Sequence, residues 1–205
     1  MNLQFASPYG CEICARPIGD DPTVRICEQC ARLDRKPQFD RAAAALEFAG
    51  NARRIVLDYK FNGHFWMLDD FADWLEAAAR SRFNVASIDA VLPMPATFRH
   101  RFDRGFNQCA YLARRVAQRL SRPCDENILR RSGSPRRQAG LSLDERWLNA
   151  VDTFAVQDRE LVAGRTILVI DDVMTTGATL SECAKTLKSA GAWRVWALTL
   201  ARAVL

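Results

Sequence analysis

The sequence predicts an α/β domain with a parallel sheet flanked by helices, preceded by a small N-terminal metal-binding segment. Three observations lead to this prediction. A run of β-favouring apolar residues at 167–170 is typical of a strand buried on both faces of a parallel sheet. A helical pattern follows it, and a further strand at 194–199 completes a strand-helix-strand unit. Four cysteines form two C-x₂-C pairs near the N-terminus.

Length and composition limit the class of protein. The chain has 205 residues, enough for one α/β domain and a small appendage, and its net charge is +5. No apolar run is long enough to span a membrane, and the first residues lack the basic region and apolar core of a signal peptide. We therefore expect a cytoplasmic protein without a membrane span, either an enzyme or a binding protein.

The N-terminal cysteines have the spacing of a zinc ribbon. Two pairs, each able to place two thiolates on one tetrahedral ion, are separated by twelve residues: Cys11, Cys14, Cys27 and Cys30. Two disulfides or a redox pair are the alternative, which a chain without an export signal disfavours. Residues 34–38 read as a linker, so we expect a ribbon at 1–36 held by structural Zn²⁺ and a second domain at 37–205.

The segment between the cysteines and the apolar run at 167–170 predicts alternating strands and helices. Strands are expected at 42–48 and 87–92, a short helix at 51–61 that Asn51 could cap, and a longer helix at 68–81. Pro93 and Pro95 end the second strand. A helix should begin at residues 105–107. Residues 130–137 read as a flexible basic loop, 138–149 as helical and 153–156 as a short strand or turn.

Two adjacent carboxylates, Asp171 and Asp172, stand where the central strand should end, and a turn of Thr and Gly residues leads into a helix. Backbone N–H groups and the dipole at a helix start bind anions. Carboxylates instead suit ribose hydroxyls or Mg²⁺. The stretch therefore predicts a phosphate beside a polyol, and it matches neither the P-loop nor the dinucleotide-binding motif. The alternative is an ordinary buried strand and turn with a capping Thr.

Basic residues are concentrated in one part of the chain. Eleven arginines lie between Arg99 and Arg137, opposed there by three acidic residues. Beside a phosphate loop, such a segment suggests a polyanionic ligand such as pyrophosphate or nucleic acid. A solvated helix face is an equally good explanation for the arginines at 114, 115 and 119. Lys60 would neutralise a phosphate if it is functional, and is otherwise a surface lysine.

Residues 169–180, VIDDVMTTGATL, resemble the phosphoribosyl-pyrophosphate signature of the type I phosphoribosyltransferases. With the cysteine ribbon, the Y-K-F-x-G stretch at 59–63, P-x-P at 93–95 and R-x-x-R-G-F-N-Q at 101–108, nearly the whole chain resembles the ComF family. Those proteins are phosphoribosyltransferase-like and are associated with bacterial DNA uptake and utilisation. The resemblance implies a type I phosphoribosyltransferase-like sheet behind a small zinc ribbon.

The resemblance also implies roles for individual residues. Asp171 and Asp172 would contact the ribose and act in catalysis. The phosphate- and ribose-binding site would comprise the same acids with Val173, Met174, Thr175, Thr176, Gly177, Ala178 and Thr179. A loop at 93–97 would hold pyrophosphate through backbone N–H groups, of which Met94, Ala96 and Thr97 have one to donate. Further contacts with pyrophosphate or DNA would fall on Arg99, Arg101, Arg104, Asn107 and Gln108.

Two functions follow from this assignment. The first is a ComF-like protein that binds a 5′-phosphorylated sugar and single-stranded DNA, and that acts in DNA uptake, with proteins of the uptake machinery as possible partners. Arginines of the basic segment would then extend the phosphate track, and Phe98, Phe102 and Phe106 could stack on bases. The second is an active phosphoribosyltransferase that uses phosphoribosyl pyrophosphate and Mg²⁺ on an unknown acceptor.

Overall fold

A four-stranded parallel sheet forms the centre of the protein in the computed structural model, which describes residues 2–7, 9–19, 23–32, 36–96, 105–132 and 153–203. The strands are β1 (Arg41–Glu47), β2 (Ala90–Pro93), β5 (Thr166–Met174) and β6 (Arg194–Arg202). Their spatial order is β1-β6-β5-β2, and every neighbouring pair is parallel. This confirms the predicted fold class.

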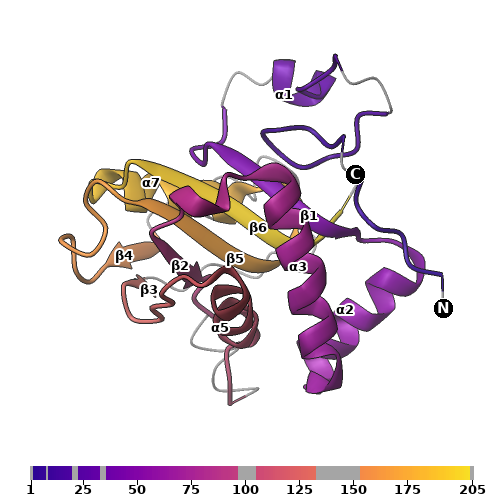
Figure 1. Ribbon diagram of the computed structural model, residues 1–205. Coiled ribbons are helices and arrows are strands. Elements are labelled where there is room, and N and C mark those ends of the chain that lie inside the picture. Colours follow the sequence, from indigo (N-terminus) through magenta and orange to yellow (C-terminus); the bar gives the residue numbers. More distant parts are fainter. Residues whose placement is uncertain are drawn as a thin grey trace.

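Helices cover both faces of the sheet (Figure 1). On one face lie α2 (Gly50–Asn62), α3 (Leu68–Arg82) and α5 (Gln108–Leu120), which share an apolar core. On the other face α7 (Ala178–Ser189) packs with a two-stranded antiparallel sheet of β3 (Leu129–Arg131) and β4 (Phe154–Val156). The short elements are α1 (Glu28–Arg32) and the 3₁₀ turns η1 (Phe65–Met67) and η2 (Val85–Ser87).

The central strand is apolar throughout its first half because both of its faces are buried. Leu168 and Ile170 belong to the core beneath α2, α3 and α5, whereas Ile167 and Val169 belong to the core beneath α7. Successive strand residues point to opposite faces, so a strand between two helical layers has no polar face. The two cores therefore meet on β5, the strand that carries the acid pair.

The acid pair lies inside the central strand, and the expectation that the strand ends there was wrong. β5 continues to Met174 because β6 runs beside it, with Met174 opposite Arg202. On the other side β2 stops with Pro93 opposite Ile170. The last residues of β5 therefore extend beyond β2 while remaining paired with β6.

Other local predictions need adjustment. The strand expected at 87–92 is β2, since η2 occupies residues 85–87. Asn51 does not cap α2: the cap position is Ala49, and the Asn51 amide donates to the Asn2 carbonyl. Arg130 and Arg131 belong to β3 because they pair with β4, so the basic loop begins later than expected. The helix expected at 138–149 lies outside the described residues.

The cysteine segment, which carries Cys11, Cys14, Cys27 and Cys30, lies beside the edge strand β1, at the top of Figure 1 together with α1. Its backbone joins the sheet edge, because the Ala42 N–H donates to the Glu12 carbonyl at 3.1 Å. Residues before the cysteines also pair with this edge, with Phe5 opposite Leu46. Within the described parts of the chain, no helix combines the length and apolarity needed to cross a lipid bilayer.

Candidate functional site

The predicted site residues gather at the carboxyl-terminal edge of the sheet. Asp171 and Asp172 extend past the end of β2, and the Thr-Gly loop connects β5 to α7. The start of α5 comes to the same edge, because Gln108 and Cys109 both contact the acid pair. Open α/β sheets bind their ligands at this edge.

Asp172 is buried and fully engaged by protein groups. Its carboxylate accepts hydrogen bonds from Lys60 Nζ at 2.8 Å, Gln108 Nε2 at 3.0 Å and the Val173 N–H at 2.7 Å, and only 4% of the residue is exposed. Burial opposes the charged form, but the Lys60 ammonium and these hydrogen bonds hold the pKa of Asp172 below its usual value. Asp172 is therefore an anchor whose charged form the protein stabilises.

Asp171 is different, because no cation pairs with it among the described residues. Its Oδ1 accepts from the Asp172 N–H at 2.9 Å and lies 3.5 Å from Cys109 Sγ. Burial, then the neighbouring Asp172 charge, raises the pKa of Asp171 to about 7, and Lys60 opposes this only in part. The residue is partly exposed. A bound hydroxyl or cation would satisfy this carboxylate.

The last turn of α2 positions the first turn of α5. Tyr59 is 1% exposed, and its hydroxyl donates to the Gln108 carbonyl at 2.7 Å. The next residue, Lys60, reaches Asp172. Burial lowers the pKa of Lys60, but the Asp172 charge outweighs it and the net shift is upward. Gln108 Oε1 is buried and has no hydrogen-bond partner among the described residues, so this side chain retains an acceptor beside the acid pair.

The loop after β5 has the geometry of an anion site. Gly177 precedes α7 with a φ of 80°, a left-handed conformation that glycine adopts without strain. Helix α7 begins at Ala178, so N–H groups of its first turn have no acceptor within the helix. The Ala178 N–H lies 3.3 Å from Thr176 Oγ1. The Thr176 hydroxyl and the first amides of α7 therefore lie together at the helix start.

The second predicted loop is only partly as expected. The Met94 N–H donates to the Ile170 carbonyl at 2.8 Å, so the sheet already uses this expected pyrophosphate donor. Asn107 caps α5 through the Cys109 N–H and donates to the Met94 carbonyl at 3.1 Å, which makes it an organising residue. Ala96 lines the adjoining pocket. Four further predicted contacts lie outside the described residues: Thr97, Arg99, Arg101 and Arg104.

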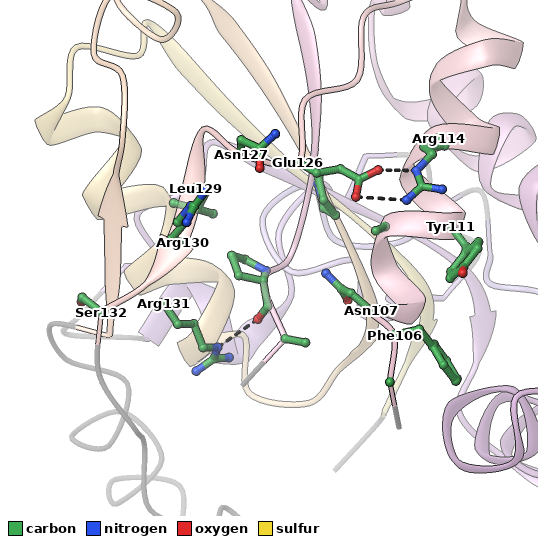
Figure 2. A pocket seen from close by; sticks show the side chains of 15 residues that line it. Phe106, Asn107, Tyr111, Arg114, Glu126, Asn127, Leu129, Arg130, Arg131 and Ser132 are labelled. Carbon is green, nitrogen blue, oxygen red and sulfur yellow. Dashed lines mark hydrogen bonds and ion pairs between the residues drawn. The ribbon is translucent and has the colours of Figure 1, made fainter. Parts of the chain in front are cut away.

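A cavity of about 860 Å³ opens between the end of β2, the start of α5 and β3 (Figure 2), and neither acid of the pair is among the described residues that line it. Arg131 donates through Nε to the Pro95 carbonyl at 2.9 Å and stacks 4.8 Å from the Phe154 ring. Burial lowers the pKa of Arg131, and the Asp171 charge opposes this shift. Arg114 is paired with Glu126 at the opposite wall, near Tyr111. The cavity is thus cationic and partly aromatic.

The four N-terminal cysteines converge as a metal site would require. One sulfur from each of Cys11, Cys14, Cys27 and Cys30 lies within 4.8 Å of the others, and all four residues are buried. The Cys14 and Cys27 sulfurs are 3.7 Å apart, near the edge of about 3.8 Å that follows from a tetrahedral ion with Zn–S bonds of about 2.3 Å. Four buried thiols with this spacing suit a tetrahedral thiophilic ion such as Zn²⁺.

The sequence did not identify three residues of the site. Lys60 pairs with a buried carboxylate, whereas we expected it to meet a phosphate or solvent. Cys109 belongs to the apolar core and also contacts Asp171, a contact that no local pattern indicates. Arg131 lines the cavity from a strand that we took for a loop. The place of Arg131 in a basic run was the only sequence signal for any of the three residues, because the contacts of all three join residues that are far apart in the chain.

Known proteins match this chain along most of its length. A family model described as a phosphoribosyl transferase domain matches residues 107–203, which include the acid pair and the phosphate loop. Competence protein F of Haemophilus influenzae is 29% identical, over 98% of this chain and 94% of its own. DNA utilization protein YhgH of Escherichia coli is 26% identical, over 92% of this chain and 88% of its own. Competence protein ComFC of Bacillus subtilis is 27% identical, over 92% of this chain and 75% of its own.

Replacing Cys11 and Cys14 together by Ser should abolish metal binding. We expect about one zinc per chain in the unaltered protein and less than about a tenth of that in the double variant, because two of four ligands are lost. Elemental analysis of freshly purified protein measures this. Cys124→Ser is the matched control, since Cys124 lies outside the cluster. Equal zinc in the double variant and the control would contradict the assignment.

Asp171→Asn should change how stability depends on pH. The pKa of Asp171 is raised in the folded state, so its protonated form contributes stability below pH about 4 that is lost as pH rises through about 7. Asp172, Lys60, Cys109 and Arg131 are the groups that act on this carboxyl. Relative to the unaltered protein, the variant should gain on the order of 2 kcal/mol between pH 5 and pH 8. Urea unfolding of both proteins at pH 5 and pH 8 tests this. The prediction would be refuted if their free energies of unfolding differed by the same amount at the two pH values.

Proposed function

This chain belongs to the ComF family of phosphoribosyltransferase-like proteins, and we propose that its candidate site binds a 5′-phosphoribosyl group. The parallel sheet with flanking helices is of the type I phosphoribosyltransferase-like α/β class. The 5′-phosphate occupies the loop of Thr175, Thr176, Gly177, Ala178 and Thr179. The ribose hydroxyls face Asp171 and Asp172, beside Val173 and Met174 where β5 ends.

The proposal is carried by one observation: an anion loop at a helix start follows directly upon two carboxylates with different environments. Asp172 is held by Lys60 and Gln108, whereas Asp171 has no cation partner among the described residues. A phosphate alone would need the loop but not the acids, and a metal alone would not need the loop. A phosphorylated sugar uses both groups.

The substituent at C1 of the sugar would extend into the cavity between β2, α5 and β3. Arg131 offers a cation there, and its terminal nitrogens make no hydrogen bond to other described residues. For phosphoribosyl pyrophosphate this substituent is pyrophosphate, and Mg²⁺ would be shared between its oxygens and Asp171. The backbone of Ala96 and the residues that follow it would complete this subsite, with Thr97, Arg99, Arg101 and Arg104 as the predicted contacts.

The biological role that we propose is in DNA uptake or utilisation, through binding of single-stranded DNA. Two relatives are named competence proteins and a third a DNA utilization protein. The cavity supports the proposal, because it combines arginines with exposed edges of Phe106 and Tyr111, the combination that binds phosphates and bases of single strands. Structural Zn²⁺ at the four cysteines and contacts with uptake-machinery proteins complete the proposal.

The second candidate is an active phosphoribosyltransferase. In that reaction the bond between C1 and the pyrophosphate oxygen breaks, pyrophosphate leaves with the bonding electrons, and an acceptor atom forms the new bond to C1. The observation that favours it is that Asp171 pairs with no cation among the described residues, so its negative charge would be available to an oxocarbenium-like sugar. Pyrophosphate release in the presence of a nucleic-acid or base acceptor distinguishes this function from binding alone.

Asp171→Asn and Asp172→Asn should each weaken binding of phosphoribosyl pyrophosphate with Mg²⁺ by about tenfold or more, because each removes a charged acceptor for the sugar or its metal. Isothermal titration calorimetry measures the affinity. Glu160→Gln, at an exposed position in the turn before β5, removes one carboxylate elsewhere and should leave affinity unchanged. Unaltered affinity in both Asp variants would disprove the assignment of the acid pair.

Replacing Arg130 and Arg131 by Gln should weaken binding of single-stranded DNA and lower its salt dependence. Each lost phosphate contact should reduce the slope of log affinity against log salt by about 0.7. Fluorescence anisotropy with a 5′-phosphorylated oligothymidylate at several salt concentrations gives both quantities. Arg159→Gln is the control, since Arg159 is exposed in the segment before β5 and does not line the cavity. Identical slopes in the double variant and the control would exclude the cavity from DNA binding.

A further inference from the structure

A buried arginine lies between the cysteine site and the phosphate loop. Arg202 is the last residue of β6 and is 3% exposed. No carboxylate forms an ion pair with it within the described ranges of the chain. A buried charge without a counter-charge is costly, so the hydrogen bonds that Arg202 makes must compensate for its burial.

The hydrogen bonds of Arg202 go to two segments that are far apart in the sequence. Nε donates to the Cys14 carbonyl at 2.7 Å, within the first cysteine pair. Nη1 donates to the Met174 carbonyl at 3.1 Å and also contacts the carbonyls of Thr175 and Ala203. One planar guanidinium therefore holds both the cysteine segment and the first residue of the phosphate loop.

Apolar packing reinforces this connection. Ala15, which follows Cys14, belongs to the same core cluster as Phe39 and Met174. The Phe39 ring and the Met174 sulfur are also the atoms nearest to Gly177, each 3.5 Å from the position a Cβ would take there. The cysteine segment and the phosphate loop thus share one packed layer in addition to the guanidinium.

We propose that Arg202 is a positioning residue that couples metal binding at the four cysteines to phosphate binding at the Thr175–Thr179 loop; the phosphate half of this coupling rests on the function proposed above. Four thiolates holding a divalent ion carry a net charge of about −2, and so does a bound phosphate monoester. Arg202 supplies positive charge between them. With metal bound, the Cys14 carbonyl is fixed, and the guanidinium holds the Thr175 carbonyl so that the following N–H groups face the ligand.

Arg202→Met and Arg202→Lys test the coupling in the metal-loaded full chain. Arg202→Met should retain its zinc but bind phosphoribosyl pyrophosphate with Mg²⁺ about tenfold more weakly, the scale of one lost charge-assisted hydrogen bond. Arg202→Lys keeps the charge but not the planar fork, so it should recover only part of the affinity. The control is Arg82→Met, because Arg82 also bonds the cysteine segment, at the Gly10 carbonyl, but does not contact the loop. Affinity of Arg202→Met equal to that of the control would overturn the proposal.

Hydrogen exchange gives a readout that requires neither a ligand nor a variant. Chelation of the metal from the unaltered protein should speed amide exchange at residues 174–180 as well as in the cysteine segment, while the β2–β5 pairing at 167–170 keeps its protection. Unchanged exchange at 174–180 after metal loss would refute the coupling. If the protein fails to bind phosphoribosyl pyrophosphate yet shows this exchange change, the proposed function is wrong and the link between metal and loop stands.

Discussion

The ion pair between Lys60 and Asp172 fixes the relative positions of three elements on which the site depends. Because Asp172 is buried within the central strand, its charge requires a partner, and α2 supplies one from its last turn. Tyr59, the preceding residue, holds the Gln108 carbonyl and thereby the start of α5. Since Gln108 also donates to Asp172, helix α2, strand β5 and helix α5 close a ring of hydrogen bonds around one carboxylate.

Because of this ring, the two adjacent acids have different roles. Asp172 is held by the protein, and its charge organises neighbouring elements. Asp171 contacts a thiol and a backbone N–H but no cation among the described residues, and its pKa is raised accordingly. An anchored carboxylate beside an unneutralised one gives a ligand a fixed frame and a reactive point of contact. Two aspartates with the same surroundings could not take these two different roles.

Local patterns predicted the central strand, the turn before α7 and the clustering of the four cysteines, because each depends on neighbours in sequence. The apolar run at 167–170 reports two buried faces, and Gly177 reports a left-handed turn. The contacts that complete the site escaped prediction because they cross the fold. Lys60 meets Asp172 from 112 residues away, and Arg202 meets Cys14 from 188. The length of β5 was predicted wrongly for a related reason, because the pairing with β6, and not the position of the acids, determines where β5 ends.

The overhang of β5 past β2 has a consequence for the behaviour of the protein at high concentration. Along that stretch the described residues supply no strand next to β5 on the β2 side, and an open strand edge invites addition of a foreign strand. Here the Asp172 N–H donates to the Asp171 carboxylate and the Val173 N–H to that of Asp172. The acids therefore occupy two backbone donors of this stretch themselves, and Asp171 adds a partly exposed carboxyl group there. The two side chains that we propose to contact the sugar would thus also oppose the addition of a foreign strand.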